Sequence, residues 1–340
     1  MSEMSRARTQ RTIDNKPRTF PLVKDISIAP EWEAAAEMIS RQAGIVLVIG
    51  VPGSGKSTLS RYLVHYLTHG HRTVALIDCD VGQTHLGPPT TIGMSLYKKP
   101  PDRLDTLQPN YMRFIGAPSP VGHISDVVYG TKWLSDKAWH GGAVGVIINT
   151  SGLILGTAGT VLKLSKVGVV APQYVLALQE SSEIESLLME VRRRDSASII
   201  RLPVSDDAQK RSLEARRRLR EEKYRAYFKD AKTMTLPLSL VDLSRQGHDR
   251  EKNIGSNKEP NMLLGLCDQQ GCALALGILQ AWDVNGQWMH VLTPLSAGNR
   301  EKVASVQFGD IKVHPDGVEE NGQGQTWGKK REGSVLDIGQ

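Results

Sequence analysis

Short apolar runs alternate with helix-like segments in the part of the chain before Pro237. Five of these runs have the length and composition of strands, at residues 45–49, 73–77, 143–148, 174–178 and 198–202. Helix signals lie around and between them, at residues 30–44, 56–67 and 182–193. A strand that is apolar along its whole length is buried on both faces. The alternation therefore predicts an α/β domain with a mostly parallel sheet that helices cover on both sides.

The pattern changes after Pro237. Residues 245–260 are polar and carry mixed charge, which is typical of a linker or a long exposed loop. Short strand-like runs follow at residues 262–266, 273–279, 288–293 and 303–308, and they predict a small antiparallel β module. We therefore expect a disordered basic tail at 1–20, the α/β domain at 21–236, a β-rich module at 237–317 with a loop or linker at 244–260, and a loose tail at 318–340.

The composition supports this division and limits the class of protein. Apolar residues make up 40% of the 340 residues, enough for a sizeable core, and the net charge of +6 permits an anionic partner without identifying one. The three cysteines have no CxxC spacing, so neither a disulfide framework nor a zinc site is expected. No apolar run approaches the ~18 residues of a membrane span, and we expect a cytoplasmic protein without a membrane segment. The sequence carries no signal for an oligomeric state.

A glycine-rich string, GVPGSGKS, occupies residues 50–57 and satisfies the GxxxxGK[ST] pattern between a predicted strand and a predicted helix. The glycines let backbone N–H groups point at phosphate oxygens, and the helix N-terminus adds the positive end of its dipole. Lys56 is expected to reach the outer phosphates and the Ser57 hydroxyl to bind Mg²⁺. The predicted nucleotide-binding residues are Gly50, Val51, Pro52, Gly53, Ser54, Gly55, Lys56, Ser57 and Thr58. The motif predicts binding of ATP or GTP and leaves the reaction open, because GTPases, ATPases and kinases share it.

Two carboxylates follow the second predicted strand, in the string DCDVGQ that contains Asp78 and Asp80 and ends at Gln83. Ligands of open α/β sheets bind at the carboxyl ends of the strands. There the two carboxylates can hold Mg²⁺ or accept a proton from an attacking hydroxyl, and phosphoryl transfer needs both. The sequence therefore favours phosphoryl transfer at this edge of the sheet.

Together with the string GPPTTIG at 87–93, these motifs resemble the polynucleotide 5′-hydroxyl kinases. That family includes the eukaryotic pre-mRNA cleavage-complex and pre-rRNA-processing kinases and shorter archaeal-type relatives. Residues 149–152 resemble the TxG clasp of the family, and residues 216–220 resemble its RxxxR lid, followed by its typical ending at 225–228. The resemblance covers residues 21–317 and is strongest over 44–93.

The resemblance implies a role for each matching residue. The implied catalytic residues are Lys56 at the triphosphate, Asp80 as general base, and the lid arginines Arg216 and Arg220. The implied metal ligands are Ser57 and Asp78, and the implied acceptor and clasp residues are Gln83, Thr150 and Gly152. One position departs from the family: Leu153 stands where the clasp often has Trp, and it offers no ring on which a base stacks.

The lid lies within a basic segment, residues 192–232, which holds fourteen Lys or Arg against seven Asp or Glu. Arg216 and Arg220 are four residues apart and share a face on a helix. That face can close over a triphosphate, or it can follow an RNA backbone. A solvated helix, with its arginines paired to Glu214, Glu221 and Glu222, is the third possibility.

Our interpretation is ATP-dependent phosphorylation of the 5′-hydroxyl end of RNA in RNA processing, with Mg²⁺ as cofactor. DNA is a second candidate acceptor and GTP a second candidate donor. One alternative is a GTPase or ATPase switch, although the nearest match to the guanine-reading NKxD motif, the string NKEP at 257–260, lacks the aspartate. The other alternative is a scaffold for RNA processing that binds ATP without transferring phosphate.

Overall fold

The computed structural model describes residues 28–320 except 43, 70–71, 102–104, 107, 195–196, 205–210, 242–258, 284 and 286. The predicted tail at 1–20, most of the predicted linker at 244–260, and residues 321–340 lie outside the described residues.

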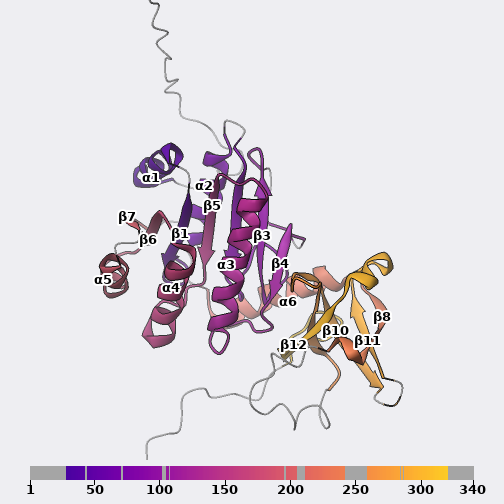
Figure 1. Cartoon of the computed structure of the whole chain (residues 1–340). Coiled ribbons are helices and arrows are strands. Elements are labelled where there is room, and N and C mark those ends of the chain that lie inside the picture. Colours follow the sequence, from indigo (N-terminus) through magenta and orange to yellow (C-terminus); the bar gives the residue numbers. More distant parts are fainter. Residues whose placement is uncertain are drawn as a thin grey trace, which may run out of the picture.

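A seven-stranded sheet organises the larger part of the molecule (Figure 1). Side by side, its strands are β4 (Tyr111–Phe114), β3 (Thr91–Tyr97), β2 (Val74–Cys79), β5 (Gly145–Thr150), β1 (Ile45–Gly50), β6 (Tyr174–Leu178) and β7 (Ser198–Leu202). The five strands from β2 to β7 are parallel, while β3 and β4 are antiparallel at one edge. The predicted mostly parallel sheet is confirmed, and the antiparallel edge was not predicted.

Helices cover both faces of this sheet, as the fully apolar strands require. They are α1 (Pro30–Arg41), α2 (Lys56–Leu67), α3 (Ile124–His140), α4 (Gly156–Val170) and α5 (Glu185–Arg193), whereas α6 (Leu213–Phe228) packs in a separate core with β4. Successive side chains of a strand point to opposite faces. Val46 and Val48 of β1 accordingly pack in one core with α1 and α2, whereas Leu47 and Ile49 pack in another with α3, α4 and α5.

A second, antiparallel sheet of five strands follows α6. Its strands in spatial order are β12 (Ser305–Lys312), β9 (Met262–Cys267), β10 (Ala273–Asp283), β11 (Trp288–Thr293) and β8 (Lys232–Pro237), and the short 3₁₀ helices η2 (Leu238–Leu240) and η3 (Ala297–Lys302) accompany them. Because β8 pairs with β11, this sheet begins at residue 232, before the predicted module boundary at 237. The boundary was placed too late because β8 mixes polar and apolar residues and has no continuous apolar run.

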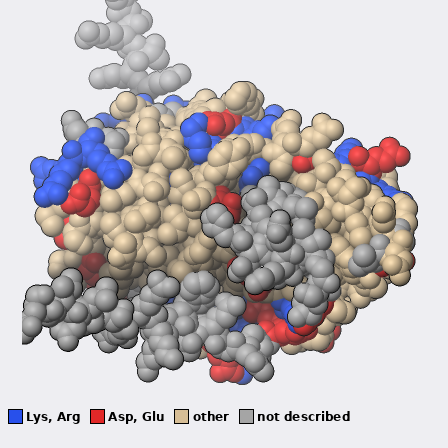
Figure 2. Space-filling view, turned by 60° about the horizontal axis from the view of Figure 1, so that its bottom comes forward, with Lys and Arg blue, Asp and Glu red and all other residues tan. Residues whose placement is uncertain are grey.

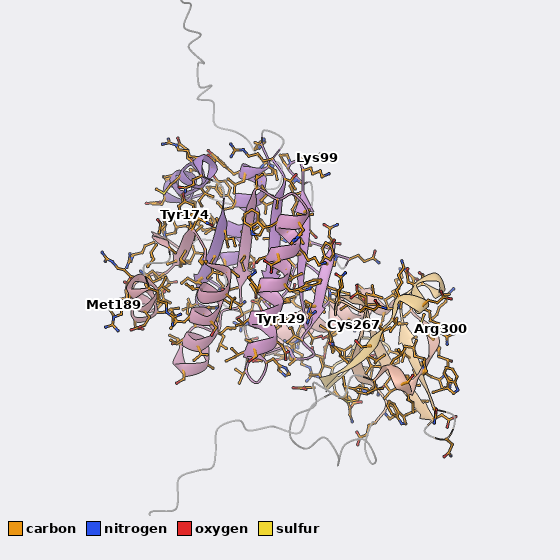
Figure 3. All side chains as sticks on the ribbon, in the orientation of Figure 1. Lys99, Tyr129, Tyr174, Met189, Cys267 and Arg300 are labelled. Atoms are coloured by element: carbon orange, nitrogen blue, oxygen red, sulfur yellow. The ribbon has the colours of Figure 1, made fainter. Side chains whose placement is uncertain are left out.

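The two sheets share a hydrophobic core. Phe114 of β4 and Tyr224 of α6 pack with Leu263 of β9 and Ile278 of β10. Cys267, labelled in Figure 3, belongs to the same core between the two sheets. The second sheet is therefore packed directly against the edge of the first.

The chain after β12 also belongs to the fold as far as it is described. Val313 pairs with Glu319 in an antiparallel bridge, and both residues are buried. The prediction of a loose tail from residue 318 is therefore wrong for residues 318–320. Within the described residues, no helix combines the length and the apolar character needed to cross a bilayer.

Candidate active site

The glycine-rich loop connects β1 to α2 at the carboxyl edge of the large sheet, the lower end of the molecule in Figure 1. Gly53 and Gly55 have φ of 81° and 87°, in the left-handed region that favours glycine. At Gly50, a Cβ atom would lie 2.5 Å from Ser54 Oγ, so only glycine fits there. The Ser54 hydroxyl is buried and has no hydrogen-bond partner among the described residues, which suits a loop that receives an anion.

Lys56 begins α2 and points back into this loop. Its Nζ donates to Val51 O at 2.7 Å, and the residue is 7% exposed. Burial lowers the pKa of Lys56 to about 8, while the nearby charge of Asp80 opposes the shift and that of Arg216 adds to it. The sequence-predicted Asp80 and Arg216 therefore both lie within electrostatic reach of Lys56.

Asp78 and Asp80 stand at the carboxyl end of β2, where the sequence places them. Asp78 is 2% exposed; its Oδ1 accepts from Asp80 N at 3.1 Å, and its Oδ2 accepts from His85 N at 2.6 Å. Asp80 Oδ1 accepts from the backbone N–H groups of Gly82 and Gln83, at 3.2 and 3.1 Å. Desolvation raises the pKa of the Asp80 carboxyl group, and the charge of Asp78 raises it further. Burial and the neighbouring carboxylate thus favour the protonated form of Asp80.

An amide that the sequence analysis did not select links the predicted metal ligands. Asn149, near the end of β5, donates from Nδ2 to Asp78 Oδ1 at 3.0 Å and to Ser57 Oγ at 3.2 Å. Asn149 Oδ1 is buried without a partner in the described part of the chain. Hydroxyl, carboxylate and amide oxygens are the donors that Mg²⁺ takes, so this set fits the ion. The sequence did carry one signal for Asn149: it is a polar residue at the end of an otherwise apolar strand.

The predicted clasp residues lie next to the loop, with different roles in packing. Thr150 is fully buried, and its Oγ1 donates to Val48 O at 2.8 Å, which ties β5 to β1. At Gly152, a Cβ atom would lie 2.7–2.8 Å from atoms of Pro52, so the clasp backbone rests on the phosphate-binding loop. Leu153 is partly buried against the core on the α3 and α4 side.

The two predicted lid arginines have different surroundings. The backbone carbonyl of Arg216 accepts from Gln83 Nε2 at 3.1 Å, which joins the lid to the DCDVGQ loop. Arg220 instead donates from Nε and Nη2 to both carboxylate oxygens of Glu319, at 2.6 and 2.7 Å. The structure thus brings Arg216 to the other predicted site residues, whereas Arg220 faces a residue outside every sequence motif.

Two further arginines of α6 are engaged by carboxylates. Arg217 pairs with Glu221 at 2.9 Å, and Arg218 pairs with Glu214. Figure 2 turns the lower end of the molecule toward the reader, and on its visible part Lys and Arg lie in separate groups beside Asp and Glu. The expectation of a paired, solvated face is therefore correct for Arg218, which is exposed.

Comparison with known proteins identifies the family of this chain. A family model described as the P-loop of mRNA cleavage and polyadenylation factor CLP1 matches residues 50–230. A polyribonucleotide 5′-hydroxyl-kinase of Pyrococcus abyssi is 31% identical over 327 residues, which cover 82% of this chain and 90% of the relative. The chain belongs to this family of P-loop polynucleotide kinases. The family resemblance predicted from the sequence is confirmed.

Further members of the family show how the similarity is distributed. A polyribonucleotide 5′-hydroxyl-kinase of Methanocaldococcus jannaschii is 27% identical, with 81% of this chain and 88% of the relative covered. The polyribonucleotide 5′-hydroxyl-kinase Clp1 of Xenopus tropicalis is 29% identical over 58% of this chain and 47% of its own length. A chain of the wild-type Clp1p–Pcf11p complex superposes with a TM-score of 0.63 at 13% identity, covering 83% of this chain and 78% of that one, which establishes a common fold.

Two buried lysines near the clasp were also not predicted from the sequence. Lys163 is 1% exposed and donates from Nζ to Ser151 O, in the clasp, at 2.7 Å. Lys166 is fully buried, and its Nζ has no partner among the described residues. Burial lowers the pKa of Lys163 well below its usual range, and the charges of Lys166 and Lys56 lower it further. Lysines three apart on a predicted helix ordinarily indicate its solvent side, so the sequence carried no usable signal.

Proposed function

We propose that this protein transfers the terminal phosphate of ATP to the 5′-hydroxyl end of RNA. The observation that carries the proposal is that Asp80 and Arg216 both lie near Lys56 at the carboxyl edge of the sheet, beside a glycine-rich loop that suits phosphate. The names of the relatives support ribonucleotide as acceptor, with DNA as the second candidate. The proposed donor is ATP, with GTP as the second candidate. All three cysteines are free, which agrees with a protein that acts in the reducing cytoplasm.

The loop residues and Lys56 bind and orient the triphosphate. The backbone N–H groups of residues 50–58, except Pro52, which has none, surround the phosphate oxygens, and the ammonium of Lys56 moves from Val51 O to the outer phosphates. Ser57 and Asp78, joined by Asn149, would hold Mg²⁺. When bound, the ion neutralises charge on the terminal phosphates. Arg216 meets the charge that develops during transfer.

Asp80 is the proposed general base. Its hydrogen bonds within the described residues all go to Oδ1, which leaves Oδ2 to receive a proton. The 5′-hydroxyl loses its proton to Asp80 as its oxygen forms a bond to the γ-phosphorus. The bond from that phosphorus to the bridging oxygen breaks, and ADP leaves. A raised pKa suits this task, because a base works best when its pKa approaches the working pH.

Radiolabelled ATP or GTP, offered with 5′-hydroxyl RNA, with 5′-hydroxyl DNA or with no acceptor, tests the proposal. We expect label on RNA in the presence of Mg²⁺ and none in its absence. Asp80→Asn should lower turnover roughly 10²–10⁴-fold while sparing ATP affinity, since the shape stays and the base is lost. Asp136→Asn, an exposed aspartate paired with Lys132, is the matched control and should behave as wild type.

Three results would contradict the proposal, each in a different way. Equal release of inorganic phosphate with and without acceptor, and no labelled oligonucleotide, would indicate an ATPase or GTPase switch. Nucleotide binding without hydrolysis or transfer would indicate a scaffold. Normal turnover in Asp80→Asn would remove Asp80 from the role of base.

A further inference from the structure

The chain after β12 folds back onto α6 as a short hairpin, residues 313–320, which we call the C-terminal strap. Its turn is closed by hydrogen bonds from His314 N to Val318 O and from Gly317 N to His314 O, each 2.8 Å. Gly317 has a φ of 89°, and a Cβ atom there would lie 2.4 Å from Arg225 N of α6. The backbone of the strap therefore rests directly on the backbone of the lid helix.

One ion pair dominates this contact. Arg220 offers Nε and Nη2 to the two carboxylate oxygens of Glu319, and the side chains are only 14% and 9% exposed. Such two-pronged, charge-assisted bonds combine strength with fixed geometry. Because water is largely excluded, removal of either partner leaves the other charge buried and unpaired. The pair is therefore built to hold two segments in one relative position.

Further polar contacts fix the strap from both sides of Glu319. The backbone carbonyl of Glu319 accepts from Arg217, and its N–H donates to Glu221 Oε1 at 3.3 Å. Arg225 Nε donates to Asp316 O at 3.2 Å. Three successive turns of α6 thus contact the strap, which distinguishes this arrangement from a single surface salt bridge.

The consequence concerns the two arginines of the lid. Arg216 precedes Arg220 by about one helical turn and lies close enough to Lys56 to lower its pKa. The carbonyl of Arg216 is bound by Gln83, at the site, while the guanidinium of Arg220 is bound by Glu319, on the strap. The two positions of the RxxxR motif are therefore held by different parts of the molecule, Arg216 through its backbone and Arg220 through its side chain.

We propose that Glu319 is a positioning residue that, through Arg220, anchors α6 so that Arg216 stands over the phosphate-binding loop. Arg220 is then the anchor of the lid and not a second phosphate contact. The catalytic part of this proposal rests on the proposed kinase function. The anchoring part is a statement about stability and is tested without substrate.

Glu319→Gln is the first test, because it keeps the size of the side chain and leaves both arginines in place. We expect a lower melting temperature and a turnover reduced about 10-fold to 10²-fold, since a small displacement of Arg216 affects the transition state more than ATP binding. Arg218→Gln, on the same helix but 72% exposed, is the matched control and should change neither. An unchanged melting temperature, or turnover at or above that of wild type, would overturn the proposal, the latter because Glu319 would then be competing with phosphate for Arg220.

A charge swap supplies the second test. Arg220→Glu and Glu319→Arg should each lower the melting temperature by roughly 5–15 °C, because each alone places like charges together in a buried site. The double variant Arg220→Glu/Glu319→Arg restores opposite charges and should regain much of both stability and turnover. A double variant that regains its melting temperature but remains inactive would show that Arg220 itself serves the phosphate. If the wild-type protein labels no acceptor, the kinase function fails while the melting temperatures still decide the anchor.

Discussion

Lys56 illustrates at the scale of one residue how burial prepares a group for its ligand. Burial lowers the pKa of Lys56 to about 8, and a triphosphate binds the protonated form. We therefore expect ATP affinity to be constant below about pH 7 and to fall by up to tenfold per pH unit above about pH 8, where free Lys56 loses its proton. Titration of a fluorescent ATP analogue at a series of pH values measures this.

The matched variant for this prediction is Lys56→Arg. A guanidinium stays charged throughout this range, so the affinity of the variant should be independent of pH above 8, whatever its absolute value. Parallel curves for the wild type and the variant would assign the pH dependence to another group and would contradict the predicted role of Lys56.

At the scale of the element, the sequence predicted those strands and helices whose pattern matches their burial. The helix α2 and the strand β6 agree with their predicted bounds, and β1 differs by one residue. The strand β3 was missed because polar residues, Thr91 and Ser95, occupy buried positions in it. The helix α4 was missed for the converse reason: it buries Lys163 and Lys166 while it exposes valines.

The site residues also fall into two groups: those in contiguous motifs were predicted from the sequence, and those that act through distant contacts were not. The phosphate-binding loop and the DCDVGQ string are each contiguous, so their chemistry is visible in the sequence. Asn149 and Glu319 act across long stretches of chain: Asn149 donates to a hydroxyl 92 residues away, and Glu319 accepts from an arginine 99 residues away. No local pattern encodes such partners, and only the fold brings them together.

The contact between clasp and phosphate-binding loop yields a prediction at this scale. Gly152→Ala places a Cβ atom 2.7–2.8 Å from Pro52, and relief of that clash must move one of the two loops. Overpacking of this kind costs about 1–3 kcal/mol, so ATP affinity should fall about tenfold or more if the phosphate-binding loop moves. Equilibrium binding of ATP is the measurement.

Gly168→Ala is the control for this substitution, and it should change the stability of the protein in the opposite direction. Gly168 is exposed on α4, and an added Cβ atom would meet only Arg194 Nη1, at 3.8 Å. Alanine in a helix interior should stabilise the protein by about 0.5–1 kcal/mol and leave ATP affinity unchanged. Unchanged ATP binding in Gly152→Ala would show that the clasp moves to relieve the clash and that the phosphate-binding loop stays in place.

At the scale of the whole molecule, the second sheet completes the first. The core shared by β4, α6, β9 and β10 contains Phe114, Tyr224 and Tyr227, and the Tyr227 hydroxyl accepts from Leu276 N at 3.0 Å. The lid helix therefore lies between two sheets, fixed by apolar packing on one side and by the strap on another. The sequence alone indicated no role for the second sheet. In the structure, this sheet supports α6, the helix that carries Arg216.

This arrangement predicts that the two sheets unfold together. Phe114→Ala removes a fully buried ring from the shared core and should cost about 3–5 kcal/mol of stability. Met289→Ala removes a fully buried side chain from the opposite side of the second sheet, far from the P-loop, and should cost about 2–5 kcal/mol. If the molecule is one cooperative unit, calorimetry of either variant shows a single transition at lower temperature, and ATP binding is lost over that same transition. Two resolved transitions in Met289→Ala, with ATP binding following only the upper one, would mean that the second sheet unfolds by itself and that α6 holds its place without it.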